Sequence, residues 1–153
     1  MYALKQVSRQ SVWVVLSTVA VLLAGCADMG TSGGNKVTLS GAQEVPPVTT
    51  SASGSGTITV APDKSVSGSI TTTGVAATAA HIHNGASGKN GPVIVPLVKT
   101  GDNVWSVPAG AKFTDAQHDS YRAGDLYINV HSAANKGGEI RGQLNAPQRS
   151  GAY

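Results

Sequence analysis

The chain alternates short apolar runs with Gly, Asn, Asp and Pro from residue 37 to residue 147, a pattern typical of antiparallel β structure. In several runs every second residue is apolar, as at Val37 and Leu39, so one face of each strand turns toward a core. Residues 92–98 are apolar on both faces, and Pro96 within them predicts a bulge or an edge position. The predicted strands are residues 37–40, 57–60, 66–70, 77–83, 92–98, 104–107, 126–131 and 139–144.

One segment departs from this pattern and predicts a helical turn at residues 115–122. Thr114 suits the N-cap, Gln117 three residues later completes a capping box, and Gly124 stands where a glycine commonly ends a helix. About eight short strands with one short helical turn predict an all-β fold. We expect an antiparallel, Greek-key-like β-sandwich.

Length and composition fit a single domain. The chain has 153 residues, and one domain commonly takes about 100 to 200. Charged residues make up only 12%, so Gly, Ser and Thr must supply much of the polar surface. The single cysteine excludes an internal disulfide. The formal charge is +3 without any run of basic residues, so we expect no nucleic-acid partner.

The first 25 residues have the layout of a secretory signal. Lys5 and Arg9 precede an uncharged, mostly apolar stretch at 11–25, which is short for a membrane span. An N-terminal membrane anchor is the alternative. Removal of the signal leaves nine basic residues against eight acidic ones, so the mature domain is nearly neutral.

The stretch from Leu23 to Cys26, Leu-Ala-Gly-Cys, resembles the bacterial lipobox. The resemblance implies that Cys26 is acylated and becomes the first mature residue, tethered stably by several acyl chains. Ala27 rather than Asp follows it, which favours the outer membrane of the cell envelope, facing the periplasm or the exterior. The predicted parts are a lipoprotein signal peptide (1–25), a lipidated flexible tether (26–35), the folded domain (36–147) and a disordered tail (148–153).

Three of the four histidines fall in predicted strands, on the face away from the core. His81 and His83 share a face because successive strand residues point to opposite sides. In the strand at 126–131, the aliphatic residues take the core side and leave His131 on the other. If the two strands adjoin, three imidazoles meet, since a His-x-His pair spans only about 6.6 Å.

Three neutral imidazoles suit copper or zinc, with a fourth position left to water or an anion. The alternative is structural: His81 and His83 hydrogen-bond the nearby glycine-rich loop, and His131 caps its hairpin. Glu139, on the non-core face of the last strand, is predicted to orient an imidazole from the outer shell of the site. Arg141 on the same face is expected to form a cross-strand ion pair of modest energetic worth.

The remaining chemistry is sparse. His118, Asp115 and Asp119 lie on the predicted helical turn and are expected to be solvated or half-packed. The sequence contains neither a phosphate-binding loop nor a nucleophile elbow, so no catalytic residue is expected.

Four motifs, in this order, resemble the CHRD domain, which is named from chordin; they lie at residues 39–47, 80–95, 124–131 and 138–143. The resemblance implies an immunoglobulin-like or related β-sandwich, which in bacteria is secreted or lipid-anchored. Some bacterial members are linked to copper, which the His-x-His and Asn-Val-His motifs would suit, here at His81, His83 and His131. Met1 and Met29 are the only methionines, which disfavours a cuprous carrier with soft ligands.

These observations favour a non-enzymatic envelope module that binds copper, or alternatively zinc, through the three histidines. A structural or protein-interaction module of the envelope, with a protein partner and no metal, is the second hypothesis. A metalloenzyme similar to copper-zinc superoxide dismutase is the third, and three strand histidines are too few to support its two bridged metals.

Overall fold

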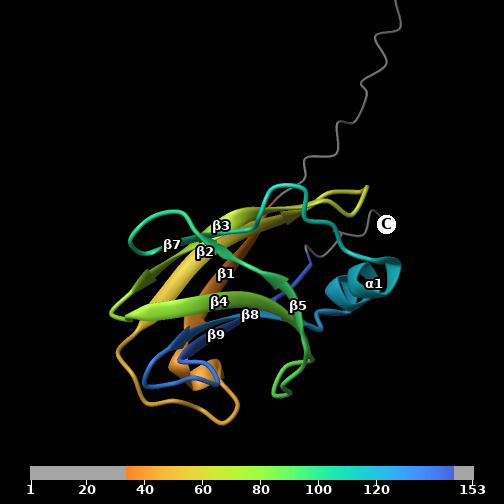
Figure 1. The fold of residues 1–153 in the computed structure, drawn as a ribbon. Helices are drawn as coiled ribbons and strands as arrows, with labels where there is room; N and C mark the ends of the chain where they lie inside the picture. The colour runs from red at the N-terminus through yellow and green to blue at the C-terminus, as the bar shows by residue number, and fades with distance from the viewer. Residues whose placement is uncertain (1–33, 147–153) are drawn as a thin grey trace, which may run out of the picture. The chain divides into compact units, whose positions relative to one another are not determined.

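The computed structural model describes residues 34–146 (Figure 1). The predicted signal segment, Cys26, nearly all of the tether and the tail at 148–153 lie outside the described residues. Within the described part, no helix is long and apolar enough to cross a membrane.

Within residues 34–146, nine antiparallel strands form one nearly closed sheet, in the order β5-β4-β8-β9-β1-β2-β3-β7-β6. The predicted all-β class is confirmed, and the layers of the expected sandwich are parts of one continuous sheet (Figure 1). The strands are β1 (Asn35–Ser40), β2 (Ser53–Val60), β3 (Val66–Thr73), β4 (Ala77–Asn84), β5 (Val93–Pro96), β6 (Val98–Lys99), β7 (Val104–Ser106), β8 (Leu126–Ser132) and β9 (Ile140–Leu144).

The sheet nearly closes because its two edge strands, β5 and β6, follow each other in one short segment of the chain. The strand predicted at 92–98 is divided: β5 pairs with β4, β6 pairs with β7, and only Leu97 separates them. The Leu97 amide still donates to the Ala80 carbonyl at 2.9 Å. Pro96, which has no amide hydrogen, is the last residue of β5.

The alternation of apolar residues builds the core as predicted. Ile82 of β4 is fully buried in it, and so are the aliphatic residues of β8 and β9. Burial of each such side chain contributes roughly 1.5 to 3 kcal/mol. The opposite face of β4, β8 and β9 therefore carries the polar residues of these strands.

The helical turn is α1 (Asp115–Ala123), and its predicted capping box is present. Thr114 accepts from the Gln117 amide, and the Gln117 side chain accepts from the Thr114 amide. Gly124 ends the helix with φ 81°, a left-handed conformation that favours glycine. His118 is half-buried beside Tyr121, and Asp115 forms an ion pair with Lys64.

Two connections cover the polar face of β8 and β9. The first contains the 3-10 turn η1 (Gly41–Gln43), and the second is the loop at 85–91 between β4 and β5. Asn90 donates to the Val45 carbonyl at 2.8 Å, which links them. Polar side chains beneath these connections are buried although they lie outside the apolar core.

Candidate metal centre

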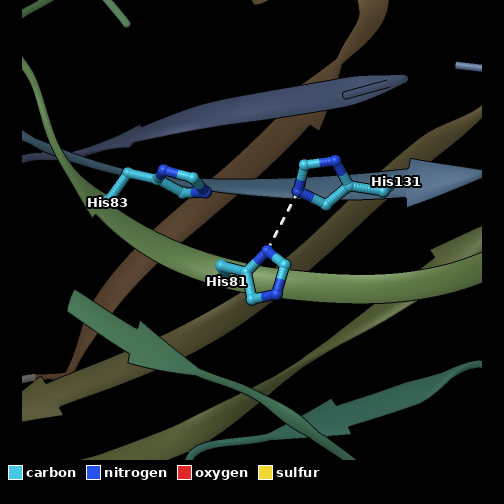
Figure 2. Close-up of side chains that lie close together, drawn as sticks. All are labelled: His81, His83 and His131. Carbon is cyan, nitrogen blue, oxygen red and sulfur yellow. Dashed lines mark hydrogen bonds between the residues drawn. The ribbon is translucent and has the colours of Figure 1, made fainter. Parts of the chain in front are cut away.

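The three strand histidines meet on the polar face of the sheet. β4 and β8 are antiparallel neighbours, with His83 opposite Tyr127, and His131 opposite Ala79. One ring nitrogen from each of His81, His83 and His131 lies within 4.8 Å of the other two. Figure 2 shows the three rings around a common space, two carried by β4 and one by β8.

Backbone carbonyls orient two of the rings. His83 Nδ1 lies 2.9 Å from the Gly91 oxygen, and His131 Nδ1 lies 2.9 Å from the Lys136 oxygen. A carbonyl oxygen only accepts, so both Nδ1 atoms carry hydrogen and, in the neutral ring, both Nε2 atoms carry a lone pair. Metal-ligating histidines are held in this way, with the second nitrogen donating to a carbonyl or carboxylate.

His81 completes the group through a hydrogen bond between imidazoles. Its Nδ1 lies 3.0 Å from His131 Nε2, the contact drawn in Figure 2. Because His131 Nε2 is an acceptor, His81 Nδ1 donates. A metal ion bound by these two atoms would replace that proton, and His81 would then carry its hydrogen on Nε2.

The surroundings of His81 and His83 favour their neutral form. Burial lowers the pKa of His81, and the neighbouring rings of His131 and His83 lower it further. Burial also lowers the pKa of His83, while the Gly91 carbonyl and the adjacent Asn129 side chain, which can accept from the charged ring, oppose that shift. Neutral imidazole is the form that binds metals.

The donor atoms fit a metal ion. His83 is only 7% exposed, and its buried Nε2 has no hydrogen-bond partner among the described residues. An unpaired buried acceptor is uncommon and needs an explanation, and a bound cation is one. Three imidazole nitrogens suit copper or zinc. His81, His83 and His131 would hold the ion, with the first two rings on one strand and the third on its neighbour.

The predicted structural roles are also present for two of the rings, because His83 bonds the glycine-rich loop and His131 bonds its hairpin. In both rings these contacts involve only Nδ1, so Nε2 remains directed toward the cluster of histidines. The carboxylate of Glu139, which the sequence predicts to orient an imidazole, accepts from the Thr50 hydroxyl at 2.9 Å, and backbone carbonyls orient the rings of His83 and His131.

The comparison with known families agrees with the motifs. The CHRD domain family matches residues 36–144, which is nearly the whole described part of the chain. The chain belongs to the CHRD family. This family is generally not enzymatic, and its domain is a β-fold binding module. No curated protein and no solved structure matches the chain.

Arg141 in this CHRD domain corrects the sequence prediction of a cross-strand surface ion pair. It is 1% exposed, and the ion pairs within residues 34–146 are Lys64–Asp115 and Lys112–Asp63. The connections that cover β9 bury the guanidinium. It donates to the carbonyls of Ala86 and Lys89 and to the side chains of Asn90 and Gln143.

Tyr127 lies between the histidines and Arg141 on the central strand of this face. Its ring stacks on His83 with centroids 4.8 Å apart, and the guanidinium carbon of Arg141 lies 3.5 Å from its centre. The Tyr127 hydroxyl accepts from the Gly91 amide at 3.2 Å. Arg141, Tyr127 and the loop at 85–91 therefore fix the position of His83 together.

Glu44 is a second buried charged residue that sequence reasoning did not single out. It is 5% exposed, and burial raises its pKa from 4.5 to about 7, although Arg141 acts to lower it. It lines a pocket of about 450 Å³ together with Arg141 and Gln143. A Cβ at Gly138 would lie 2.4 Å from the Glu44 Oε1, so glycine is needed there. Glu44 and Arg141 are far apart in the sequence, so only the tertiary structure shows that they lie close together.

Proposed function

We propose that this CHRD-family protein is a lipid-anchored, non-enzymatic module of a bacterial cell envelope that binds copper, with zinc as the alternative metal, at His81, His83 and His131. One observation carries the metal proposal. The Nδ1 atoms of His83 and His131 are committed to backbone carbonyls, and His83 Nε2 is buried without a partner beside the other two rings.

The anchoring part of the proposal rests on the sequence. The signal-like segment and the lipobox-like Leu-Ala-Gly-Cys26 support tethering at the envelope, with the outer membrane favoured by Ala27. A module held at the membrane surface by lipid needs no spanning helix of its own. Its partners are then the membrane and a metal ion, and an envelope protein is a further candidate.

The alternative is an envelope interaction module whose histidines only hold loops in place. It is favoured by the same two Nδ1 contacts, which tie the loop at 85–91 and the hairpin to the sheet. The two functions differ in whether the Nε2 atoms bind anything. Metal binding therefore separates them.

Titration of the protein with Cu(II) and Zn(II), read by competition with a chromophoric chelator, tests the proposal. We expect one ion per chain, and we expect His81→Ala to weaken binding by about 100-fold because an imidazole donor is lost. Among the described residues His81 makes no hydrogen bond to the loops, so its removal should leave the fold intact. His118→Ala is the matched control, because His118 lies on α1, away from the cluster, and should bind normally. Equal affinity of all three proteins would refute the histidine site.

A further inference from the structure

Asn129 occupies the position on β8 that neighbours all three histidines. It lies directly opposite His81 across the β4–β8 ladder, and two residues before His131 on the same face. It is diagonal to His83, whose direct partner is Tyr127. Direct and diagonal neighbours on one face have Cβ atoms within about 4.5 to 8 Å of each other. The ladder therefore places the Cβ atom of Asn129 near those of all three histidines, and the Asn129 side chain lies close enough to His83 to influence its pKa.

The orientation of this amide is fixed by the backbone. Asn129 Nδ2 donates to the Gly137 carbonyl at 3.3 Å, so the oxygen must point the other way. The side chain is 2% exposed, and Asn129 Oδ1 has no hydrogen-bond partner among the described residues. An unsatisfied buried acceptor destabilises the folded state.

His83 Nε2 and Asn129 Oδ1 are thus two buried acceptors beside each other, and neither has a donor within residues 34–146. Two lone pairs in a buried site repel unless a cation or a donor lies between them. A metal ion would satisfy both acceptors, and it would replace the proton between His81 Nδ1 and His131 Nε2.

We propose that Asn129 supplies its amide oxygen as a fourth donor to the metal ion, so that the site has three nitrogens and one oxygen from the protein. This inference rests on the proposed metal-binding function and goes beyond it. Structural metal sites take four protein donors, whereas catalytic sites keep one position open for water or substrate. A fourth donor from Asn129 would make this a site that holds an ion, in keeping with a non-enzymatic role. An amide oxygen also favours Cu(II) or Zn(II) over Cu(I).

Two substitutions at Asn129 separate the oxygen from the amide. Asn129→Leu removes both the oxygen and the bond to Gly137, whereas Asn129→Asp keeps an oxygen donor and loses only that bond. We expect Asn129→Leu to weaken Cu(II) binding by about 10- to 100-fold, with one ion per chain still bound by the histidines. Asn129→Asp should bind at least as tightly as the wild type. The electron paramagnetic resonance spectrum of bound Cu(II) should change in both variants, because the donor set changes.

The outcomes distinguish this inference from the function on which it rests. If the wild type binds no metal, both the proposed function and this inference are refuted. If the wild type and Asn129→Leu bind with equal affinity and give the same Cu(II) spectrum, the histidine site stands and the fourth donor is refuted. Should Asn129→Leu fail to fold, the spectrum of Asn129→Asp decides, since an unchanged spectrum there would equally refute direct contact.

Discussion

Replacement of Arg141 by methionine is expected to lower the free energy of unfolding by about 3 to 5 kcal/mol, because each hydrogen bond to a charged group contributes about 1.5 to 3 kcal/mol and at least two are lost. Methionine has a similar length and no charge. The substitution leaves the carbonyls of Ala86 and Lys89 without their donor and removes the cation over the Tyr127 ring. Denaturant unfolding of the two proteins measures the loss.

The matched control for this substitution is Arg122→Met, on the exposed side of α1, where the loss of unfolding free energy should stay below about 1 kcal/mol.

Metal binding provides a second measurement of the role of Arg141. Arg141 holds the loop that carries Gly91, and Gly91 orients His83. We therefore expect Arg141→Met to weaken metal binding as well. A loss of stability below about 1 kcal/mol would show that the buried guanidinium is not what secures the loop.

Glu44→Gln is expected to make the protein less sensitive to rising pH. Burial raises the pKa of Glu44 from 4.5 to about 7, so the folded protein keeps this proton at pH values where the unfolded chain has lost it. The stabilisation from the neutral carboxyl is complete below about pH 4.5, and it is lost as pH rises through about 7. The total is about 3 kcal/mol at about 1.4 kcal/mol per pKa unit. A permanently neutral glutamine avoids this loss.

Unfolding free energies of the wild type and Glu44→Gln, compared from pH 2.5 to pH 8.5, give the measurement, because the other titrating groups are common to both. The difference should move in favour of the variant by about 3 kcal/mol as pH rises. Glu139→Gln is the control with the opposite sign. Hydrogen bonds from Ser132 and Thr50 lower the pKa of Glu139, so its ionised form stabilises the fold above its ordinary pKa, and this stability is lost on acidification. A flat difference for Glu44→Gln would mean that Glu44 stays ionised beside Arg141.

Alternation along the chain was sufficient to predict most strands and their faces, but not the division of residues 92–98 into β5 and β6. The aliphatic residues of β8 had to be buried, so His131 had to lie on the other face, and the same rule placed His81 and His83 together. The capping residues Thr114 and Gln117 fixed the helix because a cap is a local interaction. The alternation of apolar residues and the capping of a helix both depend on residues close together in the sequence, so both can be predicted from one segment.

The burial of the polar face could not be predicted in this way. Which strand lies beside β4, and in what register, depends on contacts between segments about 50 residues apart. The same holds for the connections that cover Glu44, Asn129 and Arg141. A period of two places Asn129 and Arg141 away from the apolar core, and only the tertiary structure shows that this side is also buried. For the same reason the sequence assigned Arg141 to a surface ion pair.

The most direct test of metal binding by the three histidines is a long-range ¹H–¹⁵N spectrum of the imidazole rings, recorded without metal and with one equivalent of Zn(II). Without metal, His81, His83 and His131 should all carry hydrogen on Nδ1. With Zn(II), we expect the Nε2 resonances of His83 and His131 to shift, His81 to change tautomer, and His118 to remain as it was. Unchanged spectra for the three rings, or a change at His118 alone, would contradict the site.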